Sequence, residues 1–207
     1  MKQRKTDRRT LYTQAVIKDA LLELLTIQGF EKITVASLCR QAEITRATFY
    51  LHYSDLTAVV DELVDEALEI SEQTSETSVD NFIENTRFLA NTSDPEVLRK
   101  HNGLFPTCQR VADDEKYLPL FQDEALSSYV IKHIYMAEKD HMVPHYMNYC
   151  HLSQREATLM FMHDIYGAFY MNRAMGWKKD AEWYRMHSIL SRYILGAMDA
   201  LRDQERN

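Results

Sequence analysis

The sequence predicts an all-α fold, with an N-terminal three-helix helix-turn-helix domain and a larger C-terminal helical bundle, about nine helices. Three observations predict it. Only five glycines and four prolines occur in 207 residues, apolar residues recur three and four positions apart along long runs, and alternating β-branched stretches are few. With 45% hydrophobic residues, the chain has ample material for a buried core.

The first nine residues are predicted to form a basic, flexible arm. Lys5, Arg8 and Arg9 follow two further basic residues, and no apolar run stands behind them, so the segment is neither a signal peptide nor a membrane anchor. We expect the arm to add phosphate contacts or to enter a minor groove if the following domain binds DNA, although a solvated tail has the same composition. A helix is expected next, over about 10–28, closed by Gly29.

Residues 34–53 predict a pair of short helices. Thr34 can cap a first helix whose apolar side holds Val35, Leu38, Cys39 and Ala42. After a turn at Glu43 and Ile44, Thr45 can cap a second helix over 46–53. Two short capped helices separated by such a turn form a helix-turn-helix.

The second helix of this pair has the size and side chains of a DNA-reading element. Its length of roughly 13 Å fits a major groove that is about 12 Å wide. Ala47, Phe49 and Tyr53 are expected to pack inward. The outward side chains can donate to bases or phosphates, and they are Arg46, Thr48, Tyr50 and His52. Periodicity alone leaves DNA binding as one option among several, because capped helical hairpins are common in all-α proteins.

The charge distribution agrees with a DNA-facing N-terminus. The net charge is −7, yet residues 1–55 hold nine Lys and Arg against six Asp and Glu, a net charge of +3. Residues 56–207 have a net charge of −10. A basic end on an acidic remainder suits a protein that presents one face to DNA.

The order GF-x3-TV-x2-LC-x2-A-x-ITR-x-TFY-x-HY-x-D, from Gly29 to Asp55, resembles the N-terminal domain of the TetR/AcrR family of bacterial transcriptional regulators. The resemblance covers about residues 9–72. It implies that the operator meets the second helix, with Arg46 reading a base and Thr48, Tyr50 and His52 mostly on phosphates. The implied DNA-facing residues are Thr34, Ser37, Thr45, Arg46, Thr48, Tyr50, Leu51 and His52.

Three positions depart from the family pattern. Glu43 stands where the family usually has glycine in the turn, which at a left-handed position costs on the order of 1 kcal/mol and brings a negative charge near phosphates. Leu56 replaces a phosphate-binding lysine, and Ala36 replaces an arginine that often reaches a base. These departures predict weaker DNA binding by the motif itself.

The remaining chain is expected to form a connecting helix over 56–75 and a ligand-binding and dimerisation domain over 76–207. A helix-turn-helix domain over 10–55 precedes the connecting helix, which Ser54 or Asp55 can cap. The polar run at 71–78 marks the boundary between the two domains. Further helices are expected near 79–91, 95–101, 105–112, 120–143, 153–176 and 180–203.

A cavity and a dimer interface are both expected in the second half. Aromatic, Met and His side chains are abundant between about 105 and 177, and such mixtures serve as core or as the walls of ligand pockets. We expect a small, mostly apolar or aromatic effector, with a pocket drawn from Phe105, Cys108, Phe121, Tyr129, His133, Tyr166 and Tyr170. Apolar stripes on the last two helices predict a homodimer interface that includes Leu159, Met162, His163, Met186, Leu190, Tyr193 and Ala197.

No motif predicts an enzyme, a cofactor or a metal site. His141 and His145 have the spacing of two ligands on one helix, near Cys150 and His151, but Pro144 is expected to end that helix. Three widely separated cysteines favour a reduced, cytoplasmic protein, and no apolar run is long enough to span a membrane.

The sequence therefore predicts a regulator that binds double-stranded DNA as a homodimer, most often a ligand-responsive repressor in the family it resembles. The alternative is a ligand-binding or protein-interaction module that has kept the fold but lost strong DNA recognition.

Overall fold

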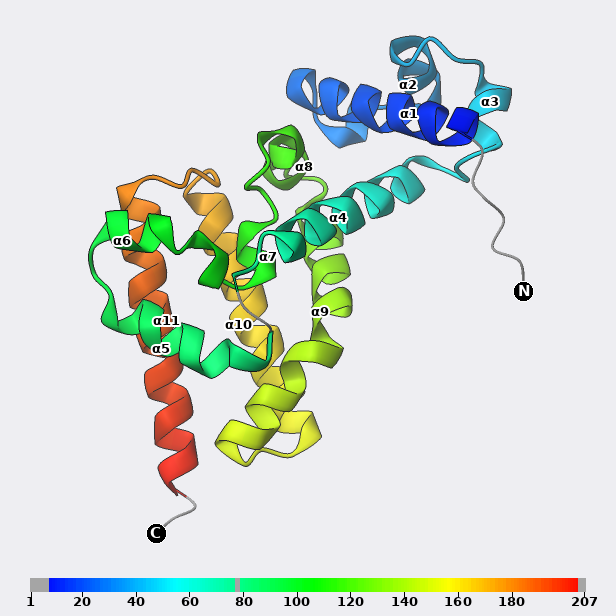
Figure 1. The fold of residues 1–207 in the computed structure, drawn as a ribbon. Helices are drawn as coiled ribbons and strands as arrows, with labels where there is room; N and C mark the ends of the chain where they lie inside the picture. Colours follow the sequence, from blue (N-terminus) through cyan, green and yellow to red (C-terminus); the bar gives the residue numbers. More distant parts are fainter. Residues whose placement is uncertain (1–7, 77–78, 205–207) are drawn as a thin grey trace.

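The structure, a computed structural model, describes residues 8–76 and 79–204, and within these ranges every regular element is a helix. The all-α prediction is confirmed. An N-terminal unit of three helices stands at one end of the molecule, and a long fourth helix leads from it into a larger bundle (Figure 1). The N-terminal unit comprises α1 (Arg8–Ile27), the 3-10 turn η1 (Phe30–Lys32), α2 (Val35–Gln41) and α3 (Arg46–Tyr50).

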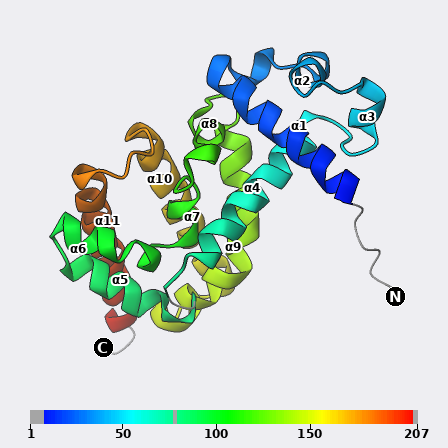
Figure 2. The ribbon, with the colours of Figure 1, turned by 45° about the horizontal axis from the view of Figure 1, so that its top comes forward.

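The bundle follows α4 (Leu56–Gln73), and the view turned by 45° shows α4 alongside α7 and α9 (Figure 2). Short helices come first in the bundle, and its three long helices follow one another at the C-terminal end of the chain. Its elements are η2 (Val79–Asn81), α5 (Phe82–Asn91), α6 (Pro95–Lys100), η3 (Asn102–Leu104), α7 (Thr107–Arg110), η4 (Glu115–Tyr117), α8 (Leu118–Gln122), α9 (Ser127–Cys150), α10 (Gln154–Ala174) and α11 (Ala181–Gln204).

The caps that begin several helices are those the sequence indicates. Asp55 Oδ1 accepts from Ala58 N at 2.9 Å at the start of α4, and Asp94 with Pro95 begins α6. Ser153 begins α10 with a reciprocal capping box to Glu156. Local chemistry therefore determines where these helices begin.

The predicted helix over 120–143 is wrong at both ends. Asp123 breaks it, because its backbone is extended and its carboxylate accepts from Leu126 N at 3.0 Å, so α8 ends and α9 begins at Ser127. Pro144 does not end α9, which continues to Cys150. Pro144 is exposed while Met142 and Tyr146 on the opposite side are buried, so packing retains the helix. The carbonyl that Pro144 leaves without its helical partner belongs to Asp140, an exposed residue.

The predicted arm over 1–9 is also shorter than expected where the structure describes it. Arg8 and Arg9 lie in the first turn of α1, whereas Lys5 lies outside the described residues. At the other end of the N-terminal unit, α8 approaches α1, and Phe30 N donates to Asp123 Oδ2 at 2.9 Å. The bundle thus contacts the N-terminal unit directly as well as through α4.

The core is continuous from the N-terminal unit into the bundle. Leu21, Leu38 and Phe49 are fully buried in the N-terminal unit, and Val60 and Leu63 of α4 belong to the same cluster. Burying such side chains stabilises the fold by about 1.5 to 3 kcal/mol each. One hydrophobic cluster therefore includes α4, the N-terminal unit and the bundle.

Candidate DNA-binding surface and ligand cavity

The turn between α2 and α3 is held by side-chain caps on both helices. Thr34 and Ser37 form a reciprocal capping box, with Ser37 N donating to Thr34 Oγ1 at 3.1 Å and Thr34 N donating to Ser37 Oγ at 2.9 Å. Thr48 N donates to Thr45 Oγ1 at 3.1 Å at the start of α3. Glu43 has φ of +53°, the left-handed conformation expected for this position.

The outer face of α3 is exposed. Tyr50 is 58% exposed and Leu51 is 81% exposed, and the Arg46 and Thr45 side chains are exposed as well. Thr48 and His52 are partly buried. The unit therefore presents one basic and several hydrogen-bonding side chains outward from a short helix.

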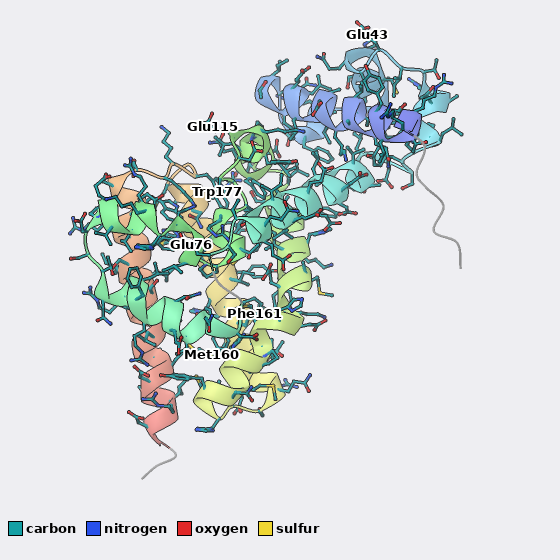
Figure 3. All side chains as sticks on the ribbon, viewed as in Figure 1. Glu43, Glu76, Glu115, Met160, Phe161 and Trp177 are labelled. Carbon is teal, nitrogen blue, oxygen red and sulfur yellow. The ribbon has the colours of Figure 1, made fainter. Side chains whose placement is uncertain are left out.

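Two details of α3 differ from the sequence prediction. Ala47 is exposed rather than packed inward, because the inner side of this one-and-a-half-turn helix is filled by Phe49. The α-helix ends at Tyr50, and Leu51 and His52 form a turn before buried Tyr53. In Figure 3, Glu43 projects from the far end of the N-terminal unit, away from the bundle.

The first turn of α1 adds to the basic surface of the unit. Arg8 and Arg9 are exposed there. Leu11 and Tyr12 follow in the same helix and are 56% and 72% exposed. Two cations at a helix N-terminus are disfavoured by the helix dipole, so an anionic partner at this position would relieve that repulsion. Composition alone did not indicate the exposed Leu11 and Tyr12.

The bundle contains a cavity of about 590 Å³, which is large enough for a drug-sized molecule. Phe105 and Cys108 line it, as expected from the sequence. Residues from α4, α5, α7, α9, α10 and α11 contribute to its walls. The walls that the sequence analysis did not identify include Leu68, Glu72, Phe82, Glu138, His141, Tyr146, Phe161, Asp164 and Ile194.

The other expected pocket residues lie elsewhere. Tyr129 and His133 line a separate, shallower pocket beside α4, where Tyr129 Oη donates to Asp61 Oδ1 at 2.7 Å. Phe121 is fully buried against Trp177, with ring centroids 5.4 Å apart. These three side chains hold helices together and do not line the cavity.

Tyr166 and Tyr170 also lie outside the cavity walls. Tyr166 packs edge-on against Tyr135 at 6.2 Å, and Tyr170 is 44% exposed. The helical spacing of the aromatic residues on α10 placed both on one side, but spacing does not show which side faces the cavity.

The expected dimer surface is largely exposed in the single chain. Leu159, Met162 and Tyr193 are 54%, 37% and 64% exposed. His163 and Ala197 are exposed, and Met186 and Leu190 are partly buried. Large apolar side chains on α10 and α11 therefore remain without cover in the isolated chain.

The cysteines and histidines show no assembled site. Cys39 and Cys150 are buried, and burial raises the pKa of the Cys108 thiol, so all three favour the unreactive thiol form. Within the described residues, no three His, Cys, Asp or Glu side chains stand close enough to hold a metal ion. None of the described helices combines the length and apolar character that crossing a membrane requires.

Comparisons with known proteins add only a distant similarity of fold. No known protein-family model matches the sequence, and no curated protein matches it. Among solved structures, the TetR family repressor AlkX from Dietzia sp. strain DQ12-45-1b, implicated in biodegradation of n-alkanes, is 13% identical with a TM-score of 0.46, covering 90% of this chain and 95% of that chain. A similarity of this size assigns neither a family nor a function.

Proposed function

We propose that the protein is a DNA-binding transcriptional regulator that acts in the cytoplasm as a homodimer and responds to a small effector. The observation that carries the proposal is the outer face of α3, where Arg46 and Tyr50 are exposed on a capped helix that a major groove can accept, with Leu51 exposed in the turn after it. The proposal assigns the protein no catalytic role.

The hydrogen-bonding groups of the α3 side chains suit different roles at DNA. Arg46 can donate two hydrogen bonds to a guanine edge, while Tyr50 and Thr45 can donate to phosphates. The capping bonds at Thr45 and Thr34 orient these groups before DNA arrives, which lowers the ordering cost of binding.

Dimerisation follows from the exposed apolar side chains of α10 and α11. Pairing two chains through Leu159, Met162 and Tyr193 would remove these side chains from water and place two α3 helices on one assembly. Two reading helices spaced about 34 Å apart meet successive major grooves of a palindrome.

Effector response requires a cavity that touches the helix leading to α3. Leu68, Glu69 and Glu72 of α4 line the cavity, and α4 shares its N-terminal core with the DNA-facing unit. An effector that fits one orientation of α4 better than another shifts the spacing of the two reading helices. A coupling of about 1 to 3 kcal/mol would change DNA affinity by roughly 5- to 150-fold.

Binding to the DNA that flanks the protein's own coding region tests the proposal. We expect a gel shift with the wild type, and Arg46→Ala should lose about 1 to 3 kcal/mol of binding, concentrated on one base pair. Arg99→Ala serves as the control, because Arg99 is exposed in the bundle and its one ion pair within the described residues is with exposed Glu96 at 3.3 Å. Equal losses from both variants would contradict the role of α3.

A second candidate function, an interaction module with weak DNA recognition, is favoured by one observation. Glu43 holds a strained left-handed conformation and places a carboxylate on the outer side of the N-terminal unit. If the wild type and the Glu43→Gly variant both fail to shift any flanking DNA fragment, this second function replaces the first.

A further inference from the structure

The walls of the 590 Å³ cavity are strongly acidic. Among the described lining residues there are five carboxylates and neither lysine nor arginine. The acidic side chains come from α4, α9 and α10. They are Asp65, Glu69, Glu72, Glu138 and Asp164.

Three of these carboxylates already have polar partners. Asp65 Oδ1 lies 2.7 Å from His133 Nε2, and Glu69 Oε1 accepts from Gln73 Nε2 at 3.2 Å. Asp164 Oδ2 accepts from Tyr146 Oη at 2.8 Å. Their charge is therefore partly compensated within the chain.

Glu138 has no such bonded partner among the described residues. Its side chain is half-buried in the middle of α9, and within the described part of the chain no hydrogen bond or ion pair reaches its carboxylate. Burial raises the pKa of Glu138, and the charge of Glu72 raises it further, against opposing contributions from His141 and Arg110. A carboxylate in this setting is destabilised in the empty cavity and gains most from a cation brought in by a ligand.

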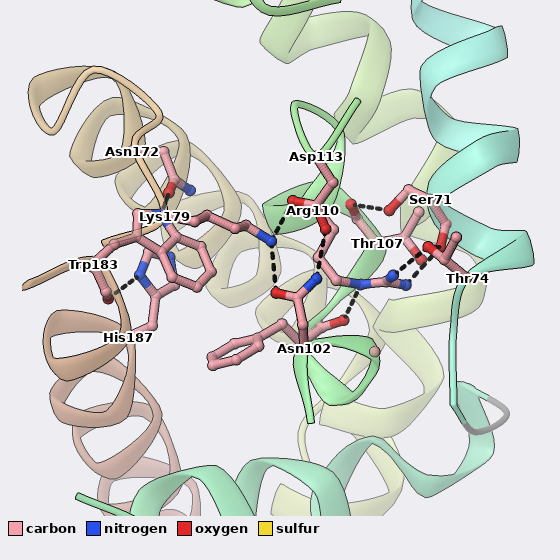
Figure 4. Close-up of polar contacts among 12 residues, drawn as sticks. Ser71, Thr74, Asn102, Thr107, Arg110, Asp113, Asn172, Lys179, Trp183 and His187 are labelled. Atoms are coloured by element: carbon pink, nitrogen blue, oxygen red, sulfur yellow. Dashed lines mark hydrogen bonds and ion pairs between the residues drawn. The ribbon is translucent and has the colours of Figure 1, made fainter. Parts of the chain in front are cut away.

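Arg110, a buried cation whose charge acts on Glu138, makes its hydrogen bonds elsewhere. Arg110 donates through Nε to Phe105 O at 2.9 Å, through Nη1 to Thr74 Oγ1 at 2.7 Å and through Nη2 to Ser71 O at 2.6 Å (Figure 4). These bonds direct the guanidinium toward the end of α4. It therefore does not neutralise the Glu138 carboxylate by direct contact.

A row of aromatic rings completes the cavity. The rings of Phe82 and Tyr146 are stacked with centroids 6.1 Å apart, and Tyr146 lies 6.1 Å from Phe161. Phe161 is found between the lower parts of α9 and α10 in Figure 3. Aromatic faces attract cations as well as apolar groups, by about 0.5 to 2 kcal/mol for each cation.

We propose that this cavity binds an organic cation, an amine or quaternary ammonium compound with an aromatic or aliphatic body, whose charged nitrogen pairs with Glu138. The body of the ligand packs against Phe82, Tyr146 and Phe161. This deepens the proposed function and rests on it for its regulatory meaning, because the effector class is named for the same cavity. It refines the sequence-based expectation of a mostly apolar effector.

The position of Glu138 links such a ligand to α4. The same cavity wall contains Glu72 of α4, whose charge acts on Glu138. A bound cation relieves repulsion between these two carboxylates and so stabilises one arrangement of α4 against α9. An uncharged ligand of the same shape has no such effect.

Calorimetric titration of the full-length protein at pH 7 with three probes tests the proposal. The probes share a naphthalene ring and differ in charge: 2-(1-naphthyl)ethylamine is a cation, 2-(1-naphthyl)ethanol is neutral and 1-naphthaleneacetate is an anion. We expect the amine to bind at least about tenfold more tightly than the alcohol, and the anion to bind most weakly, since a charge-assisted contact in a half-buried site has roughly this value.

The Glu138→Gln variant tests whether the Glu138 carboxylate is the group that pairs with the charged nitrogen of the ligand. It should weaken amine binding about tenfold and leave alcohol binding within about twofold, because only the ion pair is removed. Asp140→Asn is the matched control: it removes one negative charge from the same helix, but Asp140 is exposed and does not line the cavity. It should leave all three affinities unchanged.

Several results would overturn the proposal. They are equal affinities for the three probes, absence of amine binding, or equal losses of amine affinity in Glu138→Gln and Asp140→Asn. The ranking of probes on the wild type does not depend on any variant folding. Because no DNA is present, a failure here is distinguishable from a failure of the gel shift, which would overturn the proposed function instead.

Discussion

Two buried cations of different kinds anchor α4, one from the N-terminal unit and one from the bundle. Lys18 of α1 forms ion pairs with Glu62 at 2.7 Å and with Glu66 in the middle of α4, and we call these three residues the Lys18 cluster. At the C-terminal end of α4, Arg110 binds Ser71 O, Thr74 Oγ1 and Phe105 O without a carboxylate in direct contact, and we call this the Arg110 clamp.

The two cations differ in the groups that they bind. The Lys18 cluster joins side chains whose carboxylates are about one-third exposed, so water shares the charge. The Arg110 clamp binds one carbonyl in the last turn of α4, Ser71 O, where the negative end of the helix dipole favours a cation, together with a hydroxyl and the Phe105 carbonyl. A planar guanidinium with five donors can satisfy several such acceptors at once, and an ammonium cannot match that geometry.

The backbone around the Arg110 clamp is packed too closely for a side chain. Gly103 lies against the segment after α4, and a Cβ there would stand 2.9 Å from both Glu76 N and Thr74 O. Glu76 N donates to Gly103 O at 3.2 Å. The Arg110 clamp therefore joins one buried cation mainly to backbone groups, whereas the Lys18 cluster consists of ion pairs between side chains.

The largest expected effect comes from removing the Arg110 clamp. Arg110→Met removes three hydrogen bonds from a charged donor, two of them buried, and we expect it to lower the free energy of unfolding by about 3 kcal/mol. Urea titration measures the loss. Arg99→Met is the control, because Arg99 is exposed and its single ion pair is exposed too, so it should change stability by less than about 0.5 kcal/mol.

If Arg110→Met proved no more destabilising than Arg99→Met, the C-terminal end of α4 would be held by apolar packing alone. The contrast between a clamp and an ion cluster would then disappear.

A smaller loss is expected from the Lys18 cluster. Lys18→Met should cost about 1 to 2 kcal/mol, discounted because the partner carboxylates are partly solvated. Lys116→Met is the control, since Lys116 pairs with Asp19 at 2.9 Å on the surface and should cost less than about 0.5 kcal/mol. Thermal or urea unfolding of both variants beside the wild type measures the difference.

The pH dependence of this loss separates the two anchors. Burial lowers the pKa of Lys18, but bonds to Glu62 and Glu66 raise it by more, so its net pKa is raised. Burial raises the pKa of Glu62, and bonds from Lys18 and Tyr53 lower it by more. The Lys18 contribution is therefore complete below the unfolded lysine pKa of about 10.4 and is lost as pH rises through the higher folded value.

On the acid side, the Glu62 contribution is present above the unfolded pKa of about 4.3 and is lost as pH falls through its lower folded value. The cost of Lys18→Met should thus be greatest in the neutral range and shrink at both extremes. None of the three acceptors to which Arg110 donates titrates in this range, so the cost of Arg110→Met should stay nearly constant. Equal pH profiles for the two variants would refute the distinction.

The same contrast explains which features the sequence could predict. The helix-turn-helix caps at Thr34 and Thr45 and the left-handed turn at Glu43 depend on residues within four positions of each other, and propensity rules apply to them directly. Neither anchor of α4 is local in this sense. Lys18 meets Glu62 across 44 positions and Arg110 meets Ser71 across 39, so no short pattern indicates them.

The cavity illustrates the same limit. Phe105 and Cys108 were among the expected walls, but Glu138 was not, because an acidic residue on a long helix is ordinarily solvated. Pro144 misled the prediction for α9, since a helix retained by tertiary packing can contain proline when the ring faces water. Only the three-dimensional arrangement identifies these positions.

The smallest expected effect tests whether the Lys18 cluster extends into the bundle. Tyr117 Oη, on η4, donates to Glu66 Oε2 at 3.2 Å, and Glu66 in turn contacts Lys18 on α1. Tyr117→Phe removes one hydrogen bond to a charged acceptor while keeping the buried ring, so the free energy of unfolding should fall by about 1 kcal/mol. Tyr12→Phe, at a ring that is 72% exposed, should change it by less than about 0.3 kcal/mol. The effects of Tyr117→Phe and Lys18→Met should also be non-additive by about 0.5 kcal/mol or more, because both act on Glu66. Strict additivity in the double variant would show that η4 and α1 hold α4 independently, through the Tyr117 and Lys18 contacts to Glu66 separately.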